Sequence, residues 1–292
     1  MKKNLYLIVF LSVISVKISG QNLELVNLKS RPFFNSTNEV FNRFILNSSY
    51  TAENRQTEVG VISYLQTVGY PGVHEQFDVF ATHYVDYLKC GLGLHYSAFS
   101  YDFQDNQSYS ALYSTTVYHA DNVNVKLGAK LGLLRKKFNF DNSIVLPDFN
   151  FGIKNYWINN PFLDLGVSVQ YKKLAFGLSL PNLSRTYYKY NDSEKEYIDK
   201  GFIFNASYKF DMIEKFIFSP YIVDYYYNKN AVSLGLLSGF KDRYFLNLNY
   251  NGYMKSSAIS ASVQLFHYMK IALSFESQKD NTLSMFSVAV CF

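Results

Sequence analysis

The chain lacks any apolar run of about 18 residues beyond its first 20, although a transmembrane helix needs that length. It is also poor in charge, with 17% charged residues against roughly 25% in soluble domains. Cys90 and Cys291 are the two cysteines, and a bridge between them is not expected because they fall on distant predicted strands. These absences exclude a helical membrane protein and argue against an ordinary soluble domain.

The chain also lacks the motifs of common active sites. Its five histidines show no His-x-His or His-Glu-x-x-His spacing for a metal, and no Gly-x-Ser-x-Gly elbow occurs. Asp78 and His83 lie five residues apart on one predicted strand, so their side chains point to opposite faces and cannot pair directly. We predict no enzyme activity, no catalytic or metal site and no cofactor, with the histidines as lumen or interface residues.

The first residues predict export. MKKNLYLIVFLSVISVKISGQN has two lysines, an apolar run from Leu5 to Val16 and then small and polar residues, the pattern of a signal peptide over residues 1–20. No cysteine follows it, so a lipoprotein anchor is not indicated. The net charge of +5 includes the signal lysines and is too diffuse to predict binding to nucleic acid.

Aromatic residues are abundant, at 18% of the chain. In many segments, large apolar residues alternate with small or polar ones at a period of two. In KLAFGLSLPNL, Phe176 and Leu178 fall on one parity, and Gly177 and Ser179 fall on the other. Successive strand side chains point to opposite faces, so such a strand has one apolar face and one face of small groups. A membrane barrel turns the apolar face to lipid and the other face to its lumen.

About fourteen such segments follow one another, an even number typical of barrels in the outer membrane of Gram-negative bacteria. We therefore predict an all-β protein, a transmembrane antiparallel β-barrel of about 14 strands in the outer membrane. The barrel is expected over residues 57–292, and residues 21–56 are expected to form a periplasmic lead-in or a first barrel segment. Side chains alone do not fill a bore of this size, so a plug, a partner segment or water is expected inside.

The connections between predicted strands support a barrel. The two longest, 139–160 and 182–200, fall on the same side, where extracellular loops are expected. The chain ends on SMFSVAVCF, whose apolar residues alternate up to Phe292, a common ending of such barrels. The alternate connections are short, as periplasmic turns are: Asp121-Asn122, Lys172-Lys173, 211–215, 241–243 and the region of His267.

Several stretches resemble the PorP/SprF family of Bacteroidota outer-membrane proteins. PFLDLGVSVQYKKLAFGLSLPNL is similar to the family's GLxYxxxxFxxGLSxPxL pattern, and CGLGLHYSAFSYD to its GLGxxxxxDxxG hairpin. NRFILNSSYTAEN resembles its N-terminal F…NPAYAG segment, with Ser48 and Ser49 where Pro and Ala are usual. The family's C-terminal SHEI element is replaced by NTLSMFSVAVCF, so the resemblance is to a divergent member.

This resemblance implies a non-enzymatic role in type IX secretion and gliding motility. The barrel would be a membrane partner or surface anchor for a secreted adhesin or for the C-terminal domain of a type IX cargo protein, with periplasmic type IX components as further partners. A channel or transporter for a small solute is the alternative. In that alternative, Lys126, Lys130 and Lys209 would line the lumen.

The two longest connections hold the residues that we predict to bind the partner. Trp157 is the chain's only tryptophan, and the tyrosines of the second connection are interleaved with Arg185 and Lys189, a mixture common in binding patches. Aromatic residues at strand ends also form interfacial girdles, which is the alternative for any single tyrosine. The predicted partner-binding residues are Tyr156, Trp157, Arg185, Tyr187, Tyr188 and Tyr190.

Overall fold

The computed structural model describes most of the chain from Asn42 onward. The predicted signal peptide and the tract up to residue 41 lie outside the described residues. Among the residues described, no helix is long and apolar enough to cross a membrane. The described ranges are 42–68, 75–101, 104–138, 156–183, 187–190, 193–196, 201–213, 215–227, 229–252, 255–265, 269–278 and 284–291.

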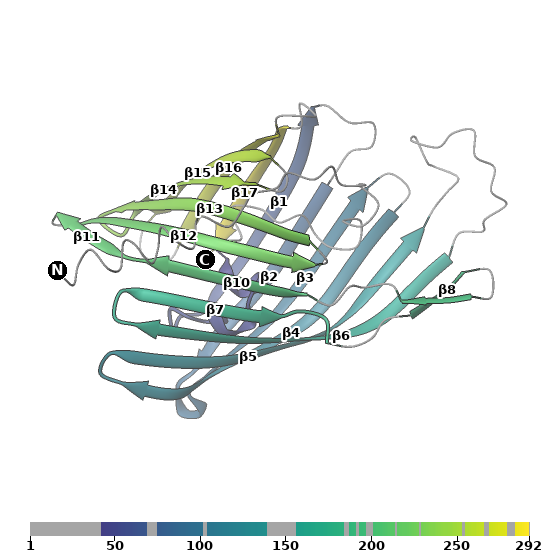
Figure 1. The fold of residues 1–292 in the computed structure, drawn as a ribbon, viewed down its shortest axis with the longest axis horizontal. Helices are drawn as coiled ribbons and strands as arrows, with labels where there is room; N and C mark the ends of the chain where they lie inside the picture. The colour runs from purple at the N-terminus through teal and green to yellow at the C-terminus, as the bar shows by residue number, and fades with distance from the viewer. Residues whose placement is uncertain are drawn as a thin grey trace. The chain divides into compact units, whose positions relative to one another are not determined.

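The described residues form one large antiparallel sheet of fifteen strand segments and a separate two-stranded hairpin (Figure 1). Three 3-10 turns also occur: η1 (Arg43–Ile45), η2 (Ser48–Tyr50) and η3 (Asp86–Leu88). The hairpin consists of β8 (Tyr187–Tyr190) and β9 (Ser193–Glu196). The segments of the large sheet are β1 (Glu58–Val68), β2 (Glu75–Val85), β3 (Cys90–Tyr101), β4 (Gln104–Ala120), β5 (Val123–Phe138), β6 (Tyr156–Tyr171), β7 (Leu174–Leu180), β10 (Phe202–Tyr208), β11 (Phe210–Ile213), β12 (Phe216–Tyr227), β13 (Lys229–Phe240), β14 (Tyr244–Asn251), β15 (Ser256–Leu265), β16 (Met269–Gln278) and β17 (Ser284–Cys291).

Segments β10 and β11 are two parts of one strand. Ser207 pairs with Tyr221 and Phe210 pairs with Phe218, so both segments keep the same register along β12. The break between them falls beside Pro220, which has no N–H to donate. The fifteen segments of the described sheet therefore make fourteen strands, the number that the sequence predicts.

The sheet closes on itself. β1 pairs with both β2 and β17, and β10 pairs with both β7 and β12, so each of the fourteen strands has a neighbour on either side. A closed sheet leaves no edge of unpaired backbone groups, which is the condition for a sheet to cross hydrocarbon. The predicted antiparallel barrel is confirmed.

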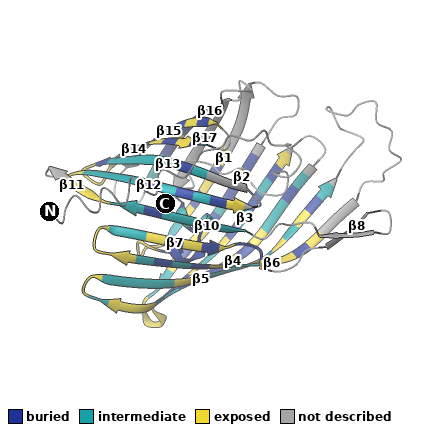
Figure 2. Cartoon of the chain, viewed as in Figure 1, coloured by how far each residue is buried: buried dark blue, intermediate teal, exposed yellow. Residues whose placement is uncertain are grey.

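Buried and exposed residues alternate along the strands (Figure 2), and many of the exposed ones are large and apolar. On β7, Phe176 and Leu178 are 37% and 38% exposed, whereas Ser179 is 2% exposed. The same holds on β14, where Leu248 is 45% exposed and Asn247 is fully buried. The predicted assignment of the two faces of these strands is confirmed.

Most turns at one end of the barrel, the short-turn end, lie where the sequence predicts them. The predicted turn 211–215 is too long, because β11 continues to Ile213 through its pairing with β12. Asp121 and Asn122 join β4 to β5, Lys172 and Lys173 join β6 to β7, and residues 241–243 join β13 to β14. Lys172 has a φ of 53°, in the left-handed region that tight hairpins need. At the opposite end, the long-loop end, residues 139–155 join β5 to β6, and residues 181–201 join β7 to β10.

The boundary of the first long connection differs from the prediction. β6 begins at Tyr156, so Tyr156 and Trp157 lie in a strand, paired with Phe138 and Lys137, rather than in a loop. The connection is accordingly shorter than the expected 139–160. β5 and β6 each have 16 residues, more than the roughly 9–11 that cross a bilayer, so their pairing continues where an apolar outer face is no longer required.

The outward position of Phe176 predicts a large cost for a charge at this site. Phe176→Arg should destabilise the barrel by about 2–4 kcal/mol if the side chain lies near the bilayer midplane. The matched variant Phe176→Leu keeps the face apolar and should stay close to the wild type. Reversible urea unfolding in lipid vesicles measures both variants, and equal stabilities would contradict the lipid-facing assignment.

Candidate functional site in the barrel lumen

The lumen contains a plug, which we define as residues 42–52. It folds as two short turns, η1 and η2, and the side chain of Asn47 caps the second one. The Asn47 carbonyl oxygen accepts from Ser49 N at 3.0 Å and from Ser49 Oγ at 2.7 Å, while its amide nitrogen donates to Val167 O of β6 at 3.1 Å. One side chain therefore both forms the turn and attaches it to the wall, using both ends of its amide.

The wall beneath the plug is built from small residues. A Cβ added at Gly128 would overlap the backbone of Ser48 and Ser49, and one added at Gly166 would overlap the Asn47 side chain. Backbone thus lies directly on backbone, which glycine permits because it has no side chain. We call this wall the small-residue floor. It is a row of directly paired residues on β3 to β7: Gly91, Ser114, Gly128, Gly166 and Ser179.

Two apolar clusters hold the plug against different arcs of the wall. Phe44 and Tyr50 belong to a buried cluster with residues of β1, β2, β4 and β16, and the Phe44 ring lies 4.8 Å from the ring of Phe80. Leu46 packs against a second cluster formed by β10 and β12, which includes Tyr221. Contacts to β1 on one side and β12 on the other mean that the plug crosses the lumen.

A buried pair of polar side chains lies close to the plug. Asp78 of β2 accepts a hydrogen bond from Gln76 Nε2 at 2.7 Å, and His95 Nε2 of β3 lies 3.0 Å from its other oxygen. Asp78 is 1% exposed and His95 4%, and the ring of Phe44 meets His95 edge-on. As the sequence predicts, His83 points to the opposite face, where its ring nitrogen lies 2.7 Å from Thr57 Oγ1.

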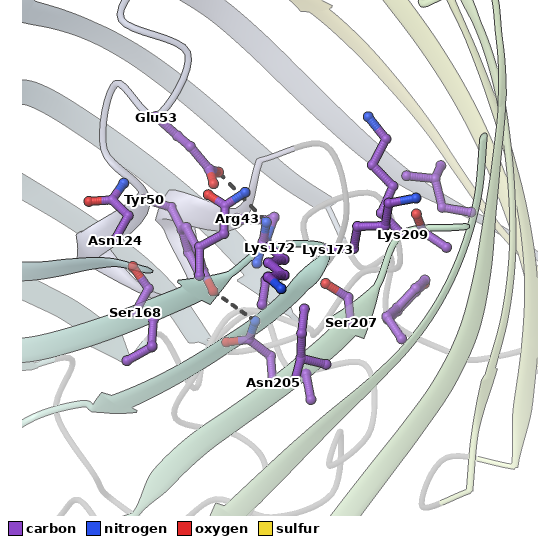
Figure 3. Close-up of a pocket in the computed structure, with 18 of the residues that line it drawn as sticks. Arg43, Tyr50, Glu53, Asn124, Ser168, Lys172, Lys173, Asn205, Ser207 and Lys209 are labelled. Atoms are coloured by element: carbon purple, nitrogen blue, oxygen red, sulfur yellow. Dashed lines mark hydrogen bonds and ion pairs between the residues drawn. The ribbon is translucent and has the colours of Figure 1, made fainter. Parts of the chain in front are cut away.

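Between the plug and the wall is a cavity with a volume of about 470 Å³ (Figure 3). On the plug side the cavity is lined by Arg43, Tyr50 and Glu53. On the wall side it is lined by residues of β5, β6, β7, β10 and β12 and by the β6–β7 turn. Arg43 lies 3.8 Å above the Tyr50 ring and 3.7 Å from Glu53. The Tyr50 hydroxyl is hydrogen-bonded to Asn205 at 3.0 Å. We call this space the basic cavity.

Positive charge dominates the basic cavity. Five cationic and two anionic side chains line it, a net charge of +3. Hydrogen bonding to Asp211, at 2.8 Å, raises the pKa of Lys173, which stays protonated at neutral pH. Burial raises the pKa of the Tyr50 phenol, which stays neutral. The charged lining residues are Arg43, Lys126, Lys172, Lys173, Lys209, Glu53 and Asp211.

The sequence matches the model of a protein family, described as the type IX secretion system membrane protein PorP/SprF, over residues 35–288. The chain belongs to this family. It is therefore an outer-membrane β-barrel of type IX secretion, and the resemblance seen in the sequence is confirmed. No curated protein sequence matches the chain.

Solved structures with a similar fold are outer-membrane barrels as well. The chain is similar to the outer membrane protein Omp33 of Acinetobacter baumannii, with a TM-score of 0.55 and 9% identity, covering 82% of this chain and 97% of that one. It is also similar to the monoaromatic hydrocarbon channel CymD, with a TM-score of 0.56 and 9% identity, covering 88% and 92%. At this identity the likeness shows the fold alone.

Five of the six residues predicted to bind a partner have a described backbone, which lies at the long-loop end of this PorP/SprF barrel, away from the basic cavity. Tyr156 and Trp157 begin β6, directly after the first long connection, and Tyr187, Tyr188 and Tyr190 lie in β8, within the second. Arg185 lies outside the described residues, and so do the side chains of the other five. Their partner-binding role stays a prediction. Within the residues described, no three His, Cys, Asp or Glu side chains gather as metal ligands would.

Most of the lumen site cannot be recognised in the sequence. Lys126 and Lys209, predicted to line the lumen, do line the basic cavity, and Lys130 lies 3.9 Å from Asp164 on the neighbouring strand. The sequence predicts a periplasmic lead-in or a first barrel segment over residues 21–56, whereas residues 42–52 form the plug, which is one of the three occupants expected of the bore. One signal pointed to it: NSSYTA is the stretch that resembles the family's NPAYAG motif, and it is the part of the plug that lies on the small-residue floor.

Proposed function

We propose that this barrel is a non-enzymatic scaffold of the type IX secretion and gliding machinery, which holds a secreted adhesin, or the C-terminal domain of a type IX cargo protein, at the cell surface. The observation that carries the proposal is the plug, which crosses the lumen and contacts strands on opposite arcs. A lumen occupied by its own chain suits a scaffold better than a pore. The link to type IX secretion comes from the membership of the chain in the PorP/SprF family.

The long-loop end is the side on which we propose the secreted partner binds. Outer-membrane barrels have short periplasmic turns and longer extracellular loops, so the long connections 139–155 and 181–201 would face outward. The hairpin β8–β9 stands within the second one and is not part of the barrel sheet. It carries three of the predicted binding tyrosines, Tyr187, Tyr188 and Tyr190.

The alternative function is a channel or transporter for a small solute. The basic cavity and the lysines lining it favour this reading, because an electropositive vestibule attracts anions. The similarity to CymD, which is a channel, shows only the fold. The plug separates the two functions: a channel requires it to move, whereas a scaffold does not.

Deleting residues 185–196 together with Trp157→Ala tests the site for the secreted partner. We expect normal amounts of folded barrel but loss of the secreted polypeptide that co-purifies from native outer membranes in mild detergent. Tyr87→Ala is the matched control, because Tyr87 is an exposed aromatic residue (84%) at the short-turn end. Full retention of the polypeptide by the deletion variant would reject the long connections as its binding site.

A further inference from the structure

The basic cavity reaches solvent at the short-turn end of the barrel. Lys172 and Lys173, which line it, form the exposed turn between β6 and β7, and the Lys173 side chain is 49% exposed. Lys209 N donates to Lys173 O at 2.8 Å, so the break between β10 and β11 lies beside this turn. Figure 3 shows Lys172, Lys173 and Lys209 on one side of the cavity and Arg43 of the plug between them and Tyr50. A ligand would therefore enter from the short-turn side.

The charge of the cavity is not balanced by the protein. Glu53 pairs with Arg43, and Asp211 pairs with Lys173. In the part of the chain that the structure describes, no carboxylate lies within ion-pair distance of Lys126 or Lys209. Lys126 thus faces a confined space with low-dielectric walls, where the attraction for an anion is stronger than on an open surface, and Lys209 lies exposed at the opening of that space.

The remaining lining suits a short peptide better than a bare anion. Ser168, Ser207 and Ser219 add hydrogen-bonding groups to the lining, and Val223 and Leu237 add apolar groups. Its volume of about 470 Å³ lies in the range of sites that enclose drug-sized ligands, roughly 300–1,000 Å³, and far exceeds one phosphate. A lipid headgroup is excluded by position, because these residues line the lumen face and lipid contacts the other face.

We infer that the basic cavity binds an acidic peptide segment of a protein that approaches from the short-turn end. Lys126 and Lys209 would pair with its carboxylates, and the serines would bind its backbone. The inference rests on the proposed role of the barrel as a protein-binding scaffold. It concerns a second protein contact, however, at the end opposite to the long connections.

Fluorescence anisotropy with a labelled hexaglutamate peptide tests the cavity on the purified, folded barrel at low ionic strength. Wild-type barrel should bind this peptide and not a hexaglutamine peptide. The double variant Lys126→Gln/Lys209→Gln should weaken binding by about tenfold or more. The matched variant Lys215→Gln/Lys241→Gln removes two lysines from other turns at the same end and should change affinity less than about twofold.

Three results would overturn the inference. The wild type could fail to bind hexaglutamate, both double variants could lose affinity equally, or inorganic pyrophosphate could displace the peptide at an equal concentration. The second result would mean a diffuse charge effect, and the third a site for small anions. This assay contains no secreted partner. A negative result here is therefore independent of whether the long connections retain the secreted polypeptide.

Discussion

Gly128→Leu should release the plug while leaving the barrel folded. A side chain at Gly128 would overlap the backbone of Ser48 and Ser49, and the plug has no room to retreat because Tyr50 and Leu46 are packed against the wall on either side. Overpacking of this kind costs about 1–3 kcal/mol. Amide exchange over residues 44–51 should therefore accelerate by roughly 5- to 150-fold, which hydrogen-exchange mass spectrometry measures.

Ala129→Leu is the control for this experiment. Ala129 is the next residue on β5, and its side chain points away from the lumen, so the variant places a leucine side chain on the opposite face. Exchange of the plug should be unchanged in Ala129→Leu. Equal protection of residues 44–51 in Gly128→Leu and the wild type would show that the small-residue floor does not position the plug.

Asp78→Ala should be among the most destabilising substitutions in the lumen. The variant removes the carboxylate that is hydrogen-bonded to both Gln76 and His95. The Gln76 amide and the His95 ring nitrogen are then buried without this partner. Hydrogen bonds to a charged group contribute about 1.5–3 kcal/mol each, so the expected loss is about 3–5 kcal/mol. Urea unfolding in lipid vesicles measures this loss.

Asp86→Ala is the matched control for Asp78→Ala. Asp86 lies in the exposed turn η3, so removing its carboxylate should change the free energy of unfolding by no more than about 0.5 kcal/mol. If the two alanine variants were equally stable, the buried pair would contribute nothing, and the lumen around it would have to be accessible to water.

The barrel wall could be predicted because its rules are local. The alternation along one strand is enough to assign Phe176 to the outer face and Ser179 to the lumen face. The Lys172–Lys173 turn is fixed by the strands on either side of it. The position of Trp157 was harder to predict, since β5 and β6 continue beyond the length that hydrocarbon requires. The apolar pattern ends with the membrane, whereas backbone pairing does not.

The lumen could not be predicted because its contacts join distant parts of the chain. Asn47 meets Val167 across 120 residues, and Tyr50 meets Asn205 across 155. In sequence, Gly128 is an ordinary small residue of an inward face, and its role follows only from what lies on it. Asp78 and His95 likewise pair through the register of β2 and β3, which the pattern of one strand does not set.

The conductance of the purified barrel in planar bilayers tests the central claim, that the plug closes the lumen and the protein acts as a scaffold. The wild type should give no stable ion current. A variant lacking residues 42–55, shown to be folded by its heat-modifiable mobility, should give open-channel currents, because fourteen strands enclose more space than side chains fill. Wild-type currents equal to those of the deletion variant would contradict the claim and establish a channel.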